Sequence, residues 1–233
     1  MKAIVLAGGL GTRIQGAISQ DIPKPMAPVH GKPFLEYLLK YLSQNGMTHI
    51  ILSVGHKYQK IKDYFGSYFY GMEIAYSVEK NPLGTGGAIK YALDSISESE
   101  RHVLVLNGDT YFPVKIRQFI DHHVQVGSDI SLALNRIEDI SRYGSIELDQ
   151  TSRIRAFLEK GGVGSGLING GIYILHQNFF SNADVPGAFS FEEYLSENVE
   201  SLHISGVQFD NYFIDMGIPE DYEKIQNELL NQL

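Results

Sequence analysis

The chain has 233 residues, and its 27 acidic side chains outnumber its 19 Lys and Arg side chains, which gives a formal net charge of −8. It contains no cysteine, which excludes disulfides, thiolate nucleophiles and zinc–thiolate sites. The acidic balance, without a basic stripe, argues against nucleic acid as a partner, although a local cluster of donors can hold a mononucleotide. With 43% apolar residues, we expect one folded domain over residues 1–233.

The first residues predict neither a signal peptide nor a membrane span. Only about five apolar residues separate Lys2 from Gly8, too few for a signal-peptide core and far too few to cross a bilayer. We therefore expect a soluble, cytoplasmic protein with no membrane partner. The sequence leaves open whether it forms a homo-oligomer.

Apolar runs of strand length alternate with helical patterns along the first 135 residues. The runs are rich in Val, Ile and Leu and are bounded by Gly, Asn or Ser, which is typical of strands covered on both faces. They occupy residues 3–7, 49–54, 102–106 and 129–134. Between the first two, apolar residues recur at helical spacing, as in Leu35, Leu38 and Leu42. The alternation predicts an α/β fold with a mostly parallel sheet flanked by helices.

After residue 140 the pattern changes to shorter, hairpin-like strands around SIELD, RIRAFLE and GGIYIL. Ser190 followed by Glu193 is a capping-box pattern that predicts a helix, and Pro219 predicts the first turn of a last helix. No hexapeptide period follows residue 160, so we expect no C-terminal β-helix. The change of pattern divides the chain into halves at about 1–135 and 136–233.

A glycine-rich stretch, LAGGLGTR at residues 6–13, follows the first predicted strand. Glycines let main-chain N–H groups approach an anion closely, and the arginine adds a cationic fork. The spacing fits neither the dinucleotide fingerprint nor the Walker loop. PKPM follows at 23–26, where two prolines restrict the backbone around Lys24. Alone, each motif is as well explained by a tight turn or a surface lysine, but together they predict a phosphate site.

Three further motifs follow predicted strands, at residues 79–88 (EKNPLGTGGA), 106–109 (LNGD) and 213–222 (FIDMGIPEDY). Ligands of an open parallel sheet bind outside the carboxyl ends of its strands, so we expect these motifs at one crevice. The helix N-terminus at GTGG offers N–H groups to an anion or a base edge. Asp109 and Asp215 can face a triphosphate when Mg²⁺ lies between them. Each motif alone is equally consistent with a turn.

The second half carries Tyr143-Gly144, Glu159-Lys160 and Asn169-Gly170-Gly171. Carboxylate, amide and bare backbone suit a polyhydroxylated ligand, although each piece alone is more typical of a turn or a solvated pair. The adjacent His122 and His123 point about 100° apart on a helix and cannot share a metal, so we expect one at the surface and one at the boundary of the core.

In their order along residues 3–222, these motifs resemble the sugar-1-phosphate nucleotidyltransferase family. The resemblance implies a Rossmann-like (GT-A-like) three-layer α/β/α fold, with a nucleotide-binding half followed by a sugar-binding half. It also implies a Mg²⁺-dependent reaction in which a sugar 1-phosphate attacks the α-phosphorus of a nucleoside triphosphate in line and pyrophosphate leaves. The small-molecule partners are then the nucleoside triphosphate and the sugar 1-phosphate.

The resemblance also assigns roles to residues. Catalysis falls to Arg13, which would stabilise the triphosphate and the departing pyrophosphate, and to Lys24, which would bridge the α-phosphate and the attacking phosphate. The nucleotide would contact Leu6, Ala7, Gly8, Gly9, Gly11, Thr12, Glu79, Gly84, Thr85 and Asp109. The sugar phosphate would contact Gly144, Glu159, Lys160, Asn169 and Gly170. Asp109 and Asp215 would bind Mg²⁺.

Glu79 falls at the position that reads the base in this family. A carboxylate only accepts hydrogen bonds, so it matches the adjacent N1–H and N2–H donors of guanine, although the N3–H of uracil could also pair with it. GTP is therefore the expected nucleotide, and the resemblance implies a manno-configured heptose 1-phosphate as the sugar substrate, for capsule or other surface polysaccharides. Mannose or glucose 1-phosphate with GTP, UTP or CTP is the alternative.

The chain departs from the family pattern at two places. Residues 14–17 read IQGA where the family continues L-x-P-L-T, and Ile218 stands where a threonine is common, which removes a helix cap. A catalytically silent nucleotide-sugar-binding subunit is a further alternative, which the intact set of Arg13, Lys24, Asp109 and Asp215 argues against.

Overall fold

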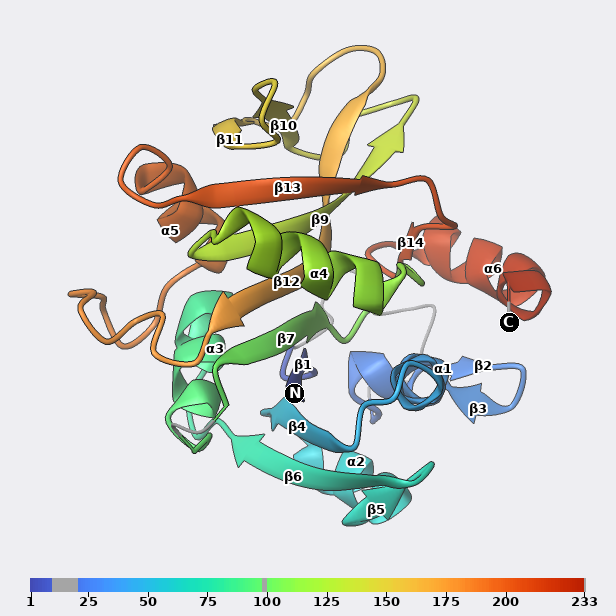
Figure 1. Ribbon diagram of the computed structural model, residues 1–233. Coiled ribbons are helices and arrows are strands. Elements are labelled where there is room, and N and C mark those ends of the chain that lie inside the picture. The colour runs from blue at the N-terminus through green and yellow to red at the C-terminus, as the bar shows by residue number, and fades with distance from the viewer. Residues whose placement is uncertain (10–20, 98–99, 233) are drawn as a thin grey trace.

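The computed structural model describes residues 1–9, 21–97 and 100–232. In this part of the chain a mixed sheet of ten strands forms the middle layer, and helices cover both of its faces (Figure 1). Its parallel strands lie in the order β7-β1-β4-β6. They are β1 (Lys2–Leu6), β4 (His49–Val54), β6 (Met72–Val78) and β7 (His102–Asn107).

The sheet continues on both sides of this parallel part. The further strands are β5 (Tyr68–Phe69), β9 (Ile130–Ile137), β10 (Ser145–Leu148), β11 (Ile154–Leu158), β12 (Gly166–His176) and β13 (Ile204–Phe209). The long strand β12 pairs antiparallel with β7, β9 and β10, so it joins the first and second halves of the chain in one sheet. β10 and β11 pair antiparallel, which confirms the hairpin-like pattern expected after residue 140.

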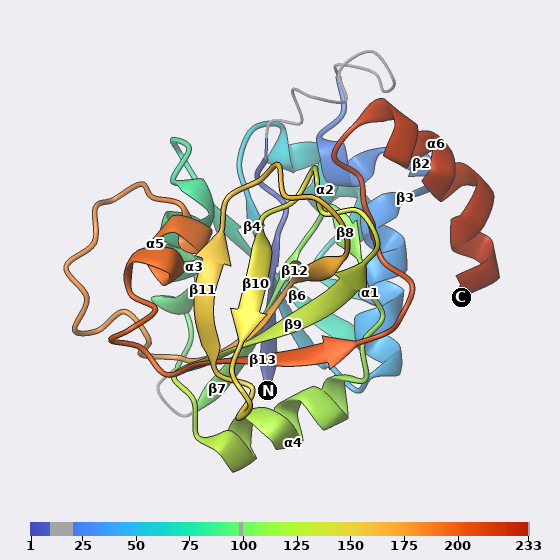
Figure 2. The same ribbon diagram turned by 90° about the horizontal axis from the view of Figure 1, so that it is seen from above.

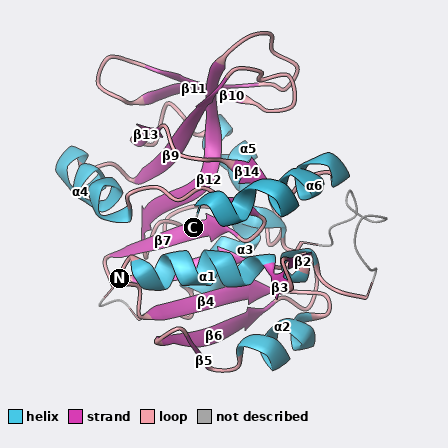
Figure 3. Ribbon diagram, turned by 90° about the vertical axis from the view of Figure 1, so that its right-hand side faces the viewer, coloured by secondary structure: helices cyan, strands magenta, loops and turns pink. Residues whose placement is uncertain are grey.

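Helices lie on both faces of the sheet (Figure 2). They are α1 (Phe34–Gln44), α2 (Tyr58–Phe65), α3 (Gly84–Leu93), α4 (Ile116–Val126), α5 (Phe191–Glu197) and α6 (Pro219–Glu228), with short 3-10 turns at Lys24–Met26 and Leu229–Gln232. Figure 3 shows α1, α4 and α6 in front of the sheet, whereas α3 and α5 pack behind it. The Ser190 hydroxyl accepts a hydrogen bond from the Glu193 N–H at 3.3 Å, which confirms the predicted cap of α5.

Two clusters of buried side chains explain the three layers. Ala3 and Val5 of β1 pack with Phe119 of α4 in one cluster, and Ile4 packs with Leu195 of α5 in the other. Because successive side chains of a strand point to opposite faces, a strand buried on both faces must be apolar throughout. The continuous apolar runs therefore predicted both the strands and the mostly parallel, helix-covered sheet, and the structure confirms this fold.

Main-chain hydrogen bonds between the parallel strands continue into the short loops at the carboxyl ends of these strands. The Ala7 N–H donates to the Ser53 carbonyl at 2.7 Å, the Gly108 N–H to the Leu6 carbonyl at 2.9 Å, and the Glu79 N–H to the Val54 carbonyl at 2.8 Å. These bonds hold the loops after β1, β4, β6 and β7 side by side. A small ribbon of β8 (Thr110–Tyr111) and β14 (Ile214–Asp215) lies beyond β7, and β2 (Pro28–Val29) pairs with β3 (Lys32–Pro33).

One histidine differs from its expected place. His123 is only 2% exposed, and its Nδ1 lies 2.8 Å from the Ser131 hydroxyl and its Nε2 3.2 Å from His102 Nδ1. The expectation of a surface and a boundary residue is therefore wrong for His123, because Ser131 of β9 and His102 of β7 provide partners for its ring. None of the helices described here is long and apolar enough to cross a membrane.

Candidate active site

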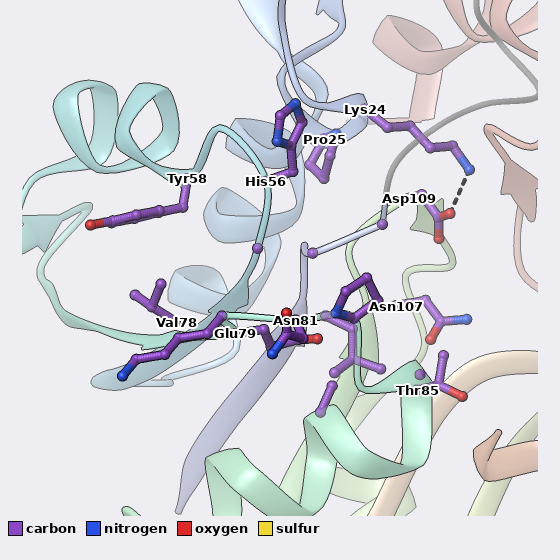
Figure 4. A pocket seen from close by; sticks show the side chains of 18 residues that line it. Lys24, Pro25, His56, Tyr58, Val78, Glu79, Asn81, Thr85, Asn107 and Asp109 are labelled. Atoms are coloured by element: carbon purple, nitrogen blue, oxygen red, sulfur yellow. Dashed lines mark hydrogen bonds and ion pairs between the residues drawn. The ribbon is translucent and has the colours of Figure 1, made fainter. Parts of the chain in front are cut away.

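A cavity of about 910 Å³ opens at the carboxyl ends of the parallel strands (Figure 4). Eight of the residues assigned to the nucleotide or to catalysis line it, namely Leu6, Gly8, Gly9, Lys24, Glu79, Gly84, Thr85 and Asp109. Ala7 is buried, with only 2% of its surface exposed, and does not line the cavity as described. Gly11, Thr12 and Arg13 lie outside the described residues.

The loop after β1 passes very close to the loop after β4. A Cβ on Gly8 would lie 2.9 Å from Glu79 Oε1 and 3.3 Å from the Gly55 nitrogen. A side chain at Gly8 would thus displace the Glu79 carboxylate and crowd the Gly55 main chain. A Cβ on Gly9 would meet no described atom within 4 Å, so the main chain at Gly9 is open toward the cavity that it lines.

The Glu79 carboxylate is held in place at the wall of the cavity. Its Oε1 accepts from the Ser53 hydroxyl at 3.2 Å, and its Oε2 accepts from the Leu83 N–H at 3.1 Å. A carboxylate has about four acceptor positions, so each oxygen keeps capacity for one more donor. Glu79 therefore presents a fixed pair of acceptors to a ligand.

The glycines at the start of α3 have a structural role that the sequence interpretation missed. Gly84 has φ +69°, and a Cβ there or on Gly86 would collide with Phe189. The Gly86 N–H donates to the Phe189 carbonyl at 3.0 Å, and the Thr85 hydroxyl accepts from the Phe191 N–H at 2.9 Å. The Gly86 N–H is thus paired with Phe189, not free for an anion as predicted, although Gly84 and Thr85 do line the cavity.

Lys24 and Asp109 meet in an ion pair at the cavity, with 2.5 Å between Nζ and Oδ2 (Figure 4). Lys24 lies in a 3-10 turn between Pro23 and the buried Pro25, and its side chain is only 12% exposed. Asp109 follows β7 directly. The prolines restrict the turn, so the ammonium group is presented from a rigid backbone.

Asp215 is brought to Asp109 by the β8–β14 ribbon. Asp215 pairs with Thr110, and the Met216 N–H donates to the Asp109 carbonyl at 2.8 Å. Burial raises the pKa of the Asp215 carboxyl to about 6, and the Asp109 carboxylate adds to this rise while Lys24 opposes it. Two carboxylates that repel each other in a buried place are the arrangement that a cation between them would stabilise.

Asp109 and Asp215 fit a divalent cation that takes its remaining ligands from water and a bound phosphate group. Within residues 1–9, 21–97 and 100–232, no three His, Asp or Glu side chains form a group that could hold a metal alone. Mg²⁺ commonly takes one or two protein carboxylates and completes its octahedral shell with water and phosphate oxygens. Asp109 and Asp215 therefore fit Mg²⁺ that arrives with a nucleotide.

Asn169 is committed to contacts within the protein. Its Nδ2 donates to the Tyr173 hydroxyl at 2.7 Å and to Glu192 Oε1 at 2.8 Å, and its Oδ1 accepts from the Gly171 N–H at 3.0 Å. Both amide hydrogens are used, so this side chain keeps acceptor capacity only at Oδ1. A Cβ on the neighbouring Gly170 would lie 2.5 Å from the Phe112 ring, so packing alone already requires glycine there.

The remaining residues assigned to the sugar phosphate lie around β10 and β11. Gly144 precedes β10, and a Cβ on it would lie 2.8 Å from the Leu158 carbonyl. Glu159 and Lys160 follow β11 and are exposed. In the structure as described, none of the five sugar-phosphate residues lines the 910 Å³ cavity.

Ten further residues line the cavity without having been assigned an individual role, and most of them belong to the predicted motifs at 23–26, 79–88 and 106–109. They are Pro25, Gly55, His56, Tyr58, Val78, Lys80, Asn81, Pro82, Ala88 and Asn107. Gly55 and His56 directly follow β4, as Gly8 follows shortly after β1. The rule that ligands bind at the carboxyl ends of parallel strands could have identified them, because 49–54 was itself a predicted strand.

Comparison with known proteins agrees with this architecture. A family model described as "Nucleotidyl transferase" matches residues 2–232. A D-glycero-alpha-D-manno-heptose 1-phosphate guanylyltransferase of Campylobacter jejuni is 46% identical over 222 residues, which cover 95% of this chain and 97% of the relative. An enzyme of the same name from Aneurinibacillus thermoaerophilus is 44% identical over 230 residues, covering 98% of both chains.

Solved structures are similar over nearly the whole length. The crystal structure of HddC from Yersinia pseudotuberculosis superposes with a TM-score of 0.87 at 37% identity, covering 98% of this chain and 99% of that chain. A second structure of HddC, complexed with GMP-PN, gives a TM-score of 0.86. The full-length family match, the near-complete relatives and the cavity at the strand ends lead to one conclusion: this chain belongs to the nucleotidyl transferase family.

Proposed function

We propose that this protein is a guanylyltransferase that converts GTP and D-glycero-α-D-manno-heptose 1-phosphate into GDP-heptose and pyrophosphate. The observation that carries the proposal is the Lys24–Asp109 pair at a cavity whose wall presents the fixed Glu79 carboxylate. The near-full-length relatives named above are heptose 1-phosphate guanylyltransferases, which supports the same substrates here. Such a product would supply capsule or other surface-polysaccharide synthesis, and its nucleotide substrate would place the enzyme in the cytoplasm.

The chemistry asks the protein to hold two polyanions together. An oxygen of the sugar phosphate forms a bond to the α-phosphorus of GTP, the bond from that phosphorus to the β-phosphate oxygen breaks, and pyrophosphate leaves with the electron pair. Lys24 would neutralise the α-phosphate and the attacking phosphate, and Arg13 the departing pyrophosphate. Mg²⁺, when bound, would supply further charge neutralisation, and Asp109 and Asp215 would hold it.

Lys24 must change partners in this reaction. Its ammonium group lies 2.5 Å from Asp109 Oδ2 in the structure, and the side chain is mostly buried. A bound triphosphate offers it a more concentrated negative charge than one carboxylate does. Under the proposal, Lys24 turns from Asp109 to the phosphates, which leaves the Asp109 oxygen free to bind the metal.

Glu79 would select guanine. Ser53 and Leu83 fix the carboxylate, so its remaining acceptor positions face the cavity in one orientation. The N1–H and N2–H donors of guanine lie side by side and can both be accepted by one carboxylate. Adenine offers no such pair of donors, and uracil offers one N–H, so the same geometry discriminates against ATP and UTP.

The sugar phosphate would lie beyond the metal carboxylates. Gly144, Glu159, Lys160, Asn169 and Gly170 are proposed to surround it on the resemblance to the family. The contacts of Asn169 limit its share to acceptance at Oδ1, and Gly170 would contribute only main-chain atoms, because the Phe112 ring occupies the place of a side chain.

A substrate grid tests the proposal. GTP, UTP, CTP and ATP are each combined with heptose, mannose, glucose and N-acetylglucosamine 1-phosphates in Mg²⁺, and nucleotide-sugar formation is followed by mass spectrometry. We expect the highest kcat/KM with GTP and heptose 1-phosphate. Preference for mannose or glucose 1-phosphate would contradict the sugar, preference for UTP would contradict the role of Glu79, and no product in any combination would indicate a silent subunit.

A further inference from the structure

The loop before β10 and the first turn of α6 are joined by one two-point ion pair. Arg142 donates from NH2 to Asp221 Oδ2 at 2.6 Å and from NH1 to Asp221 Oδ1 at 3.3 Å. Arg142 lies in the loop before β10, and Asp221 lies in the first turn of α6. The Asp221 side chain is 16% exposed, so the carboxylate is largely removed from water. Two parallel contacts fix direction as well as distance.

Arg142, the loop residue of this pair, directly precedes Tyr143 and Gly144. The Tyr143 ring packs edge-on against Phe213, with 6.1 Å between ring centroids, and the Arg142 guanidinium lies 5.7 Å from the centroid of the Tyr143 ring. Burial raises the pKa of Tyr143, and the charge of Asp215 adds to this rise. Through Tyr143 the loop therefore contacts the Asp215 segment, residues 213–217, and through Arg142 it contacts the first turn of α6, which follows that segment.

Asp221, the helix residue of this pair, is positioned by contacts that α6 makes with other segments of the chain. The cap position of α6 is Ile218, which supplies no side-chain hydrogen bond in the described chain. Instead, the Tyr222 hydroxyl and the Gln226 amide both donate to the Pro28 carbonyl, at 2.5 and 2.7 Å. Pro28 lies shortly after the turn that carries Lys24. The start of α6 is thus tied on one side to the Lys24 segment and on the other to Arg142.

We propose that Arg142 and Asp221 are a positioning pair that holds the Gly144 loop against the Asp215 segment. The inference rests on the proposed function, because it assigns the pair the task of keeping the sugar-phosphate loop in register with the metal carboxylates. Neither side chain needs to touch a substrate. Losing either partner frees the loop and leaves the other charge without its partner, at a site where the Asp221 side chain is 16% exposed and the Arg142 side chain 46%.

Steady-state kinetics on the full-length enzyme test the pair through Arg142→Gln, Asp221→Asn and the double variant. We expect each single variant to lower kcat/KM for the sugar 1-phosphate about tenfold, since a small displacement of a bound reactant has a large effect on rate, while the KM for GTP stays unchanged. The double variant should be no worse than the single ones, because the two residues act through one contact. Restoration of activity by Arg142→Asp with Asp221→Arg would support the pair further.

The matched control is the Arg117–Asp121 pair on α4, whose side chains are 87% and 60% exposed. Arg117→Gln and Asp121→Asn should leave both KM values unchanged. If Arg142 instead binds the sugar phosphate directly, Arg142→Gln will raise the KM for the sugar 1-phosphate, whereas Asp221→Asn will not. This result would overturn the proposal. A KM for GTP that rises as much as the KM for the sugar 1-phosphate would also overturn it.

Amide hydrogen exchange tests the pair independently of activity. Both single variants should speed up exchange in residues 141–145 and 213–217 relative to the wild type, and the α4 controls should not. Unchanged exchange in both segments would contradict the inference even in an active enzyme. The two proposals can fail separately. If the wild-type enzyme forms no nucleotide-sugar but the variants still show faster exchange, the proposed function is contradicted and the positioning pair is supported.

Discussion

Lys24 is the one described cation that the structure places directly on a proposed metal carboxylate. We expect Lys24→Ala to lower kcat by about 10²–10³-fold, because a preorganised charge at the reacting phosphates is lost. The protein should stay folded, since the Asp109 side chain, which loses its partner, is 33% exposed. Pyrophosphate release measures the effect. Lys90→Ala, which removes the partner of Asp94 on α3, is the control, and near wild-type release from Lys24→Ala would rule out its role.

Glu79 offers a test of base selection. Glu79→Gln replaces one acceptor by an N–H donor that would face a donor of guanine, so kcat/KM for GTP should fall by about 10–100-fold, while UTP should be affected less. Competition between GTP and UTP for one enzyme sample measures this directly. Glu73→Gln, at an exposed site beside His49, should change neither. An unchanged GTP preference in Glu79→Gln would show that other residues read the base.

The residues that form the charged centre could be identified by resemblance, but their contacts could not. Asp109 and Asp215 are far apart in the chain, and their meeting depends on a two-residue ribbon that no periodicity marks. The sequence also offered Asn169 as a hydrogen-bonding group, whereas Tyr173 and Glu192 take both of its amide hydrogens. Which groups accept hydrogen bonds from the Asn169 amide depends on tertiary packing, which residue types alone do not predict.

At the scale of elements, the glycines of α3 illustrate a close approach of two segments. Gly84→Ala should lower the free energy of unfolding by about 2–3 kcal/mol, because the position combines a left-handed backbone with a collision between the new Cβ and the Phe189 main chain. Gly127 shares the positive φ, but a Cβ there would meet no described atom within 4 Å. Gly127→Ala should therefore cost only about 1 kcal/mol. Urea unfolding compares them, and equal losses would contradict the packing role.

The strand β6, to which no range was assigned, differs in burial from the strands predicted as apolar runs. Residues 3–7, 49–54, 102–106 and 129–134 correspond to β1, β4, β7 and β9, because each is covered on both faces and is apolar throughout. β6 alternates buried and exposed residues near the edge of the sheet. A search for continuous apolar runs does not detect such a strand, although alternation is itself a strand signal.

At the scale of the whole molecule, stability should depend on pH through the buried His123. Burial lowers its pKa to about 4 from an ordinary value of 6.5, and His102 adds to the effect. Between pH 6.5 and 4 the unfolded chain takes up the proton while the folded chain does not, so the free energy of unfolding falls as the pH falls through this range. The full depression corresponds to about 3 kcal/mol.

His123→Asn tests this dependence, because asparagine can keep a hydrogen bond to Ser131 without titrating. The decrease in unfolding free energy between pH 6.5 and 4, measured by urea unfolding, should be smaller in this variant than in the wild type. His30→Asn, at an exposed position, should show the wild-type decrease. An identical decrease in His123→Asn and the wild type would exclude His123 as its source.

The central claim, that a sugar phosphate attacks the α-phosphorus of GTP, is tested most directly by following the oxygen atoms of the phosphate. Heptose 1-phosphate labelled with ¹⁸O in its phosphate group is incubated with the full-length enzyme, unlabelled GTP and Mg²⁺, and the products are analysed by mass spectrometry. The mechanism predicts that all of the label appears in GDP-heptose and none in pyrophosphate. Label in pyrophosphate, or pyrophosphate released without GDP-heptose, would contradict it.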